Sequence, residues 1–337
     1  TANAEAYELY LQGRFAWRQR YEDNILKSIE LFEKAIALDP DFARAHEALA
    51  SAWGVLPNWS NINNAESALN AKPHAIRALE LDPTLSEARA ILAEMIFDEH
   101  RWDDGIAEYR KAINNDPRDP TLHQWLGEAF AYMGFLSRGL EEMRIAYELD
   151  PASPVINQSL VWLASMNYED DLAMKHLAIS NGLGIGDRAF FMSIDSRVRR
   201  GDWDELFAAL NNEEDAPEIM LTCLKARKDA SLVPQLLPQL DRMIEEQGGE
   251  IPDRRLLQCL SMAGEPDRAV KLALQAIDHS WQSVSMFWAS NKATGKMRQT
   301  AAFRQILADL DLLDFYREYG WPDLCRPVGE EDFECDK

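Results

Sequence analysis

The feature that most constrains the fold is a two-part pattern that occurs twice between residues 86 and 151. Each copy holds a first apolar run, a turn near Gly105 or Gly139, and a second run that closes at Asp-Pro. Successive closing prolines, Pro83, Pro117 and Pro151, are 34 residues apart. Because proline forces the preceding residue out of the helical region, each one ends a helix. A fixed period of this size indicates stacked helix pairs, since one pair cannot bury its apolar face alone.

These marks resemble the tetratricopeptide repeat family, which has the same period. Gly127 lies in a first helix, and Ala112 and Ala146 stand shortly before the closing Asp-Pro. Tyr109 and Met143 lie three residues before those alanines. The resemblance implies an all-α fold, a right-handed α-solenoid of tetratricopeptide-like helix pairs, in which the first helices line an inner surface.

The pattern predicts three regions. Residues 1–185 are expected to form five repeats, residues 186–320 a divergent, repeat-like helical region, and residues 321–337 a C-terminal tail. The first boundary follows residues 182–186, where three glycines in five residues break the regular pattern.

Departures from the period predict local irregularities. Pro40 and Pro83 are 43 residues apart, nine more than the period, and the extra residues fall at 55–64. Pro and Asn in that segment predict a loop, and insertions in such repeats often emerge on the binding face. The first turn, residues 18–24, is also longer than the pattern requires. Near the end, apolar residues at helical spacing predict one helix over 301–319.

Composition and motifs argue against several functions. The chain has 337 residues and a formal net charge of −22, which disfavours binding to nucleic acid or anionic membranes. No apolar run of about 18 residues is present, so no membrane span is predicted. Metalloprotease, Cys-x-x-Cys and phosphate-loop motifs are absent from the sequence, so we predict no enzyme activity, cofactor or metal. His46 and His123 occupy the fourth position of a first helix and are predicted to be buried packing residues.

The family resemblance also gives the positions that face the inner surface. Aromatic, amide and charged side chains there suit a protein, a peptide or a small polar ligand. The alternative for each aromatic residue is that it packs neighbouring repeats. Ser51 and Glu87 face the same surface, where chaperone-binding members carry cationic and amide clamp residues, so a chaperone C-terminus is not expected to bind. The candidate binding residues are Tyr10, Arg14, Trp17, Arg18, Glu47, Glu94, Phe97, Gln124, Trp125, Glu128, Tyr132, Gln158 and Trp162.

The two ends of the chain carry a second resemblance. The opening segment 4–14 and the closing segments 303–307 and 319–327 look like the C-terminal half of ToxR-type bacterial regulators. Those proteins join a winged-helix DNA-binding domain, one membrane helix and a repeat domain. The resemblance implies a periplasmic sensory or interaction domain of a membrane-bound transcription regulator. The start at Thr1 fits an excised fragment or a mature form.

Two other functions remain open at this point. The chain is also compatible with a free-standing cytoplasmic scaffold or adaptor. Some bacterial nucleotide cyclases carry a similar C-terminal half, so the chain is also compatible with the regulatory region of a cyclase. The sequence does not determine the ligand, the partner or the oligomeric state.

The four cysteines are of two kinds. Cys325 and Cys335 flank a polar loop whose Pro and Gly favour a chain reversal, so we predict a disulfide between them. Such a bond persists only in an oxidising compartment, and free exposed thiols in a cytoplasmic protein are the alternative. Cys223 and Cys259 lie in apolar helical patterns and are predicted to be buried thiols that act as small hydrophobic residues.

Overall fold

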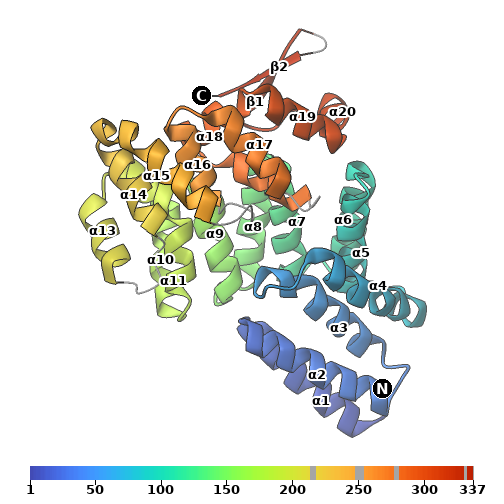
Figure 1. The fold of residues 1–337 in the computed structure, drawn as a ribbon. Coiled ribbons are helices and arrows are strands. Elements are labelled where there is room, and N and C mark those ends of the chain that lie inside the picture. Colours follow the sequence, from blue (N-terminus) through green and yellow to red (C-terminus); the bar gives the residue numbers. More distant parts are fainter. Residues whose placement is uncertain (213–217, 247–253, 277–280, 330–331, 337) are drawn as a thin grey trace. The chain divides into compact units, whose positions relative to one another are not determined.

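The computed structural model describes residues 1–212, 218–246, 254–276, 281–329 and 332–336. In these ranges the chain is built of helices, together with one two-stranded antiparallel sheet (Figure 1). The chain forms two compact units, which are described separately. Unit 1 comprises Thr1–Leu126 and Glu142–Ile156, and unit 2 comprises Gly127–Glu141 and Asn157–Lys337. The predicted all-α helical-repeat fold is confirmed.

Unit 1 is a series of antiparallel helix pairs. Its complete elements are α1 (Ala4–Gln19), α2 (Glu22–Leu38), α3 (Ala43–Val55), the short 3-10 helix η1 (Leu56–Asn58), α4 (Asn64–Leu81), α5 (Ser86–Asp98) and α6 (Trp102–Asn115). The next three helices contribute to both units: α7 (Pro120–Tyr132), α8 (Leu136–Leu149) and α9 (Pro154–Met166).

Glycine allows the two helices of a pair to approach closely. A Cβ atom at Gly13 of α1 would lie 2.5 Å from the ring of Phe32 on α2, and one at Gly105 of α6 would lie 2.3 Å from the ring of Phe97 on α5. Both rings are fully buried. A larger residue at either glycine would therefore displace an aromatic side chain from the interior.

A polar bridge recurs at one register of the helix pairs. It joins position 4 of a first helix to a residue 19 positions later on the second helix. In the second pair the separation is 28, because the insertion adds nine residues before α4. The bridges connect Arg89 to Glu108, His123 to Glu142, His46 to His74 and, in unit 2, Asn157 to His176. His46 and His123 are buried, as predicted, and hydrogen bonds satisfy their ring nitrogens.

Two predicted irregular segments are more ordered than expected. The turn predicted over 18–24 is shorter, because α1 extends to Gln19 and α2 begins at Glu22. Arg20 and Tyr21 make the turn with φ values of 57° and 65°, which side chains other than glycine adopt at a cost. The insertion at 55–64 contains η1, and its Trp59 packs edge-on against Tyr21.

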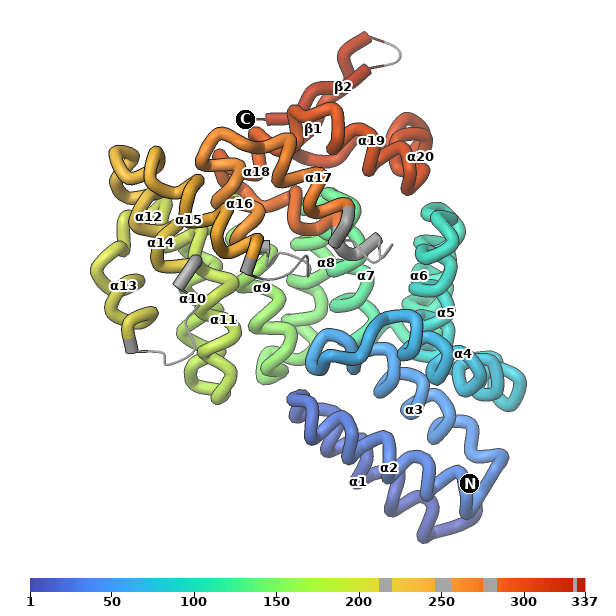
Figure 2. The backbone as a smooth tube through the Cα atoms, viewed as in Figure 1, coloured from blue at the N-terminus to red at the C-terminus, as the bar shows by residue number. Residues whose placement is uncertain are grey.

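Unit 2 continues with shorter helices, as the tube in Figure 2 shows. Gly184, with φ of 80°, lies between the first two of them, and the domain boundary predicted there stays a prediction. The elements are α10 (Asp170–Gly182), α11 (Gly186–Met192), α12 (Ile194–Arg200), α13 (Trp203–Asn212), α14 (Glu218–Lys228), η2 (Ala230–Leu232), α15 (Val233–Glu246), α16 (Arg254–Met262), α17 (Pro266–Ala276), η3 (Trp281–Trp288), α18 (Lys292–Arg298), α19 (Ala301–Asp309), α20 (Leu312–Tyr319), β1 (Cys325–Val328) and β2 (Asp332–Cys335).

The single helix predicted over 301–319 is wrong. The chain forms α19 and α20 instead, with the break at Leu310 and Asp311. Asp311 adopts a left-handed conformation, with φ of 53°. The apolar spacing continues across this break, so periodicity alone could not reveal it.

Within unit 2 the C-terminal segment is anchored on the turn between α7 and α8. The indole of Trp288 donates to the carbonyl of Tyr132 at 2.9 Å, and the hydroxyl of Tyr316 donates to the carbonyl of Met133 at 2.7 Å. Trp288 and Tyr316 are fully buried. These contacts, between residues far apart in sequence, give unit 2 its long-range core.

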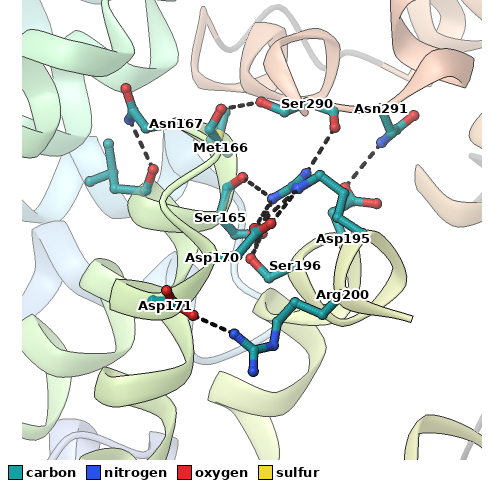
Figure 3. Close-up of polar contacts among 12 residues, drawn as sticks. Ser165, Met166, Asn167, Asp170, Asp171, Asp195, Ser196, Arg200, Ser290 and Asn291 are labelled. Atoms are coloured by element: carbon teal, nitrogen blue, oxygen red, sulfur yellow. Dashed lines mark hydrogen bonds and ion pairs between the residues drawn. The ribbon is translucent and has the colours of Figure 1, made fainter. Parts of the chain in front are cut away.

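A second polar centre of unit 2 surrounds Arg199 (Figure 3). The guanidinium of Arg199 donates to both carboxylate oxygens of Asp170 and, at 2.6 Å, to the carbonyl of Ser165. It also donates to the carbonyl of Ser290 at 3.0 Å. This arginine therefore joins α9, α10, α12 and the segment that precedes α18.

Candidate binding surface on the first helices

The predicted binding residues of unit 1 lie on the first helices of successive pairs. Helices α1 and α3 contact each other, as do α3 and α5, so side chains from three pairs can meet there. Arg18 is exposed; Tyr10, Arg14, Glu47 and Glu94 are half-buried; Trp17, Phe97, Gln124 and Trp125 are buried.

An ion pair joins the first and third pairs at this surface. The guanidinium of Arg14 donates to both carboxylate oxygens of Glu87, at 2.8 and 3.0 Å. Ser51 of α3 donates a third hydrogen bond to Glu87 at 2.8 Å. Burial opposes the ionisation of Glu87, but Arg14 and Ser51 together hold its pKa below the ordinary value. Burial likewise opposes the charge of Arg14, and Glu87 outweighs it and raises the pKa of Arg14.

Trp17 lies between two guanidinium groups. Arg14 stands 4.7 Å and Arg20 3.6 Å from its ring centre, both within range of a cation–π interaction. Arg20 is only 5% exposed, and its positive charge also lowers the pKa of Glu87. The left-handed turn at Arg20 and Tyr21 therefore supplies a second cation to this surface.

Two further carboxylates complete the group. Glu47 of α3 accepts the backbone N–H of Ala88 at 3.2 Å. Burial and the neighbouring charge of Glu87 raise the pKa of Glu47 to about 8. Asp119, just before α7, accepts the backbone N–H of Thr121, and burial and Glu87 raise its pKa to about 6. At neutral pH, Glu47 therefore retains a proton that an ordinary glutamate has lost.

We call Arg14, Arg20, Glu47, Ser51, Glu87 and Asp119 the first-helix cluster. Glu87 is matched by Arg14, whereas Glu47 and Asp119 are ionisable groups whose negative charge is disfavoured where they lie. A cation that approaches them would restore their ionised form, because an opposite charge lowers the pKa of a carboxyl group. The cluster is thus suited to binding a cationic group rather than to acid–base chemistry on a substrate.

Other predicted residues of unit 1 serve packing. The ring of Phe97 is fully buried and stacks on Trp102 and Tyr109, with centres 5.9 and 6.0 Å apart. Glu94 accepts a short hydrogen bond from the hydroxyl of Tyr109. For Phe97, the structure supports the alternative that an aromatic residue on this face packs neighbouring helices.

The remaining predicted residues lie in unit 2. Ser159 donates to Glu128 at 2.7 Å, and the rings of Tyr132 and Trp162 lie 5.5 Å apart. Gln158 is 4% exposed, and its side-chain oxygen has no hydrogen-bond donor within the described part of the chain. A ligand-binding role for these four residues stays a prediction.

Sequence reasoning placed Glu87 and Ser51 on the correct surface but did not pair them with Arg14. It missed Arg20 and Asp119. Asp119 immediately precedes the proline that opens α7, a site where a carboxylate accepts free N–H groups of the helix. That local signal predicts a helix cap but not the long-range contact with Glu87.

The cysteines form two disulfides. Cys325 and Cys335 face each other in the β1–β2 hairpin and are bonded, as predicted. Cys223 and Cys259 are also bonded, so the prediction of two free thiols is wrong, although both residues are buried. Helices α14 and α16 pack together and place the two Cα atoms 5.7 Å apart, a separation that the sequence did not indicate.

Metal and membrane sites were also sought. In the ranges given above, His, Cys, Asp and Glu side chains form no group of three that could hold a metal ion. The described helices include none with the length and apolar character needed to cross a membrane.

Comparison with known proteins gives one distant relative in sequence. No protein-family model matches the chain. The transcriptional regulator HilA of Salmonella typhimurium strain LT2 is 20% identical over 219 residues, which cover 63% of this chain and 38% of HilA. HilA of Salmonella typhi matches with the same values. The chain thus spans less than two fifths of the length of these relatives.

Solved structures with a similar fold include helical-repeat proteins. Yeast Tom70 aligns with a TM-score of 0.46 at 16% identity, covering 94% of this chain and 68% of Tom70. Pseudomonas aeruginosa PilF gives 0.44 at 14% identity, covering 80% and 98%. TTC0263, a thermophilic TPR protein of Thermus thermophilus, gives 0.43 at 17% identity, covering 58% and 97%.

Proposed function

We propose that this chain is a protein- or peptide-binding module that recognises a cationic segment of its partner at the first-helix cluster. The observation that carries the proposal is the charge imbalance of the cluster. Glu87 is neutralised by Arg14, whereas Glu47 and Asp119 have raised pKa values and, among the described residues, no comparable cation within hydrogen-bonding distance. A lysine or arginine side chain of a partner would supply that charge.

A peptide suits this surface better than a single small cation. Its residues come from α1, α3, α5 and the start of α7, so an extended ligand could contact several helices together. Trp17 adds a buried indole N–H that has no acceptor within the described residues. A backbone carbonyl of a bound peptide is the kind of group that would satisfy it.

Binding can be tested with three labelled peptides of equal length, rich in lysine, glutamine or glutamate, by fluorescence anisotropy. We expect the lysine-rich peptide to bind, and the Glu47→Gln variant to bind it at least about tenfold more weakly. Glu33→Gln is the matched control, because Glu33 is an exposed carboxylate on α2. Equal binding of all three peptides, or equal loss in both variants, would contradict the proposal.

We further propose that the module is the sensory or interaction domain of a membrane-bound bacterial transcription regulator. The two end motifs and the distant similarity to HilA support this proposal. In the native host, a Glu47→Gln substitution should change the abundance of a discrete set of transcripts, whereas Glu33→Gln should not. Unchanged transcripts in a strain that produces normal amounts of the variant would contradict the regulatory role.

A periplasmic location is part of the same proposal. Two disulfides favour an oxidising compartment, since cytoplasmic thiols are kept reduced. Denaturing the native protein in an alkylating reagent, before and after reduction, distinguishes the alternatives. Modification of all four cysteines only after reduction is expected. Full modification before reduction would favour a cytoplasmic scaffold instead.

A further inference from the structure

Helix α1 carries an exposed apolar stripe. Tyr7, Leu11 and Phe15 are 47%, 49% and 68% exposed. Single exposed apolar residues are ordinary on a protein surface, but residues four apart lie on the same face of a helix. The three side chains therefore form a continuous strip along one side of α1, which burial against α2 and α3 leaves uncovered.

Two charged residues share this face. Glu8, Leu11, Phe15 and Arg18 follow one another at spacings of three, four and three, the spacing of the buried positions in a coiled coil. All four are exposed. Arg18 makes no hydrogen bond or ion pair among the described residues, and the side chain of Glu8 accepts only a long hydrogen bond from Gln12, at 3.4 Å.

We propose that α1 packs antiparallel against α1 of a second copy of this chain. A twofold axis between Leu11 and Phe15 places Leu11 of one copy against Phe15 of the other, and the reverse. The same register places Glu8 of one copy beside Arg18 of the other, twice. One patch thus complements itself in both shape and charge, as a twofold interface requires.

The charge pattern favours a second copy over an unrelated partner. In a parallel arrangement Glu8 would face Glu8 and Arg18 would face Arg18, which is repulsive. In the antiparallel arrangement both charges are matched without any other residue, and the two helix dipoles also oppose each other favourably. Arg14 is not required, because it is engaged with Glu87.

The oligomeric state of the full chain tests the proposal by sedimentation velocity over a range of concentrations. We expect a reversible dimer that Phe15→Asp weakens by at least about tenfold. Leu69→Asp is the matched control, because Leu69 is 77% exposed on α4 and lies outside the stripe. Circular dichroism should show unchanged helicity and melting temperature for both variants, since both positions are exposed.

A charge exchange tests the register. Glu8→Arg and Arg18→Glu should each weaken the dimer, and the double variant should restore it. A chain that stays monomeric at every concentration would overturn the proposal. A dimer that Phe15→Asp leaves intact would also overturn it, as would a double variant no better than the single ones.

Discussion

Arg14 of unit 1 and Arg199 of unit 2 each hold one carboxylate through two hydrogen bonds or more, yet their surroundings differ. Arg199 is matched by a single carboxylate, Asp170, and its remaining donors reach the carbonyls of Ser165 and Ser290. Arg14 is matched by Glu87, but Glu47 lies nearby with a pKa raised to about 8.

The difference separates an architectural ion pair from a candidate binding surface. Burial disfavours the ionised form of Asp170, but hydrogen bonds from Arg199 hold its pKa below the ordinary value, so that centre is already satisfied. In the first-helix cluster, Glu47 and Asp119 are left with raised pKa values. We infer that the first centre holds helices together and that the second is kept available for a cation.

The largest expected effect is on the satisfied centre. Arg199→Met leaves Asp170 and two carbonyls without their donor, and should lower the free energy of unfolding by about 3 kcal/mol. Chemical denaturation followed by circular dichroism measures this. The control is Arg200→Met: Arg200 pairs with Asp171, which is 98% exposed, so its loss should cost less than about 1 kcal/mol. Equal losses would mean that Arg199 has no special structural role.

A smaller loss is expected in the first-helix cluster. Glu87→Gln leaves the guanidinium of Arg14 without its carboxylate and should lower the free energy of unfolding by about 2–3 kcal/mol at neutral pH. Glu47→Gln should change it by less than about 1 kcal/mol, because Glu47 is already protonated there. If the two substitutions destabilise equally, the distinction between the paired and the unpaired carboxylate is wrong.

The pH dependence of stability sharpens the same distinction. The pKa of Glu47 is about 8 in the folded chain and 4.5 as its ordinary value, so the folded state binds a proton that the unfolded state releases. Its contribution is complete below about pH 4.5 and is lost as the pH rises through about 8, by an amount on the order of 2 kcal/mol. Asp119 adds a smaller loss that ends near its own pKa of about 6.

Urea unfolding at about pH 5 and about pH 9 tests this sign. The wild type should be less stable at the higher pH, and Glu47→Gln should remove most of the difference. Glu33→Gln should retain it. A wild-type chain that gains stability over this interval would show that Glu47 is not held protonated.

The sequence predicted the helix pairs but not the contacts that distinguish the two centres. Closing prolines and small residues act locally, so the 34-residue period was enough to place α5 through α8. Arg14 and Glu87 are 73 residues apart, and their meeting depends on how three pairs stack. Arg20 reaches the cluster through a left-handed turn that no glycine marks. The Cys223–Cys259 bond likewise depends on packing between two helices.

The most direct test of the account is a pH titration of side-chain carboxyl groups by carbon-13 NMR, with Glu47→Gln used to assign one signal. We predict that this signal titrates near pH 8 in the free chain, and that a lysine-rich peptide lowers its pKa by at least about one unit. A Glu47 pKa near the ordinary 4.5 would contradict the account, as would a raised pKa that bound peptide leaves unchanged.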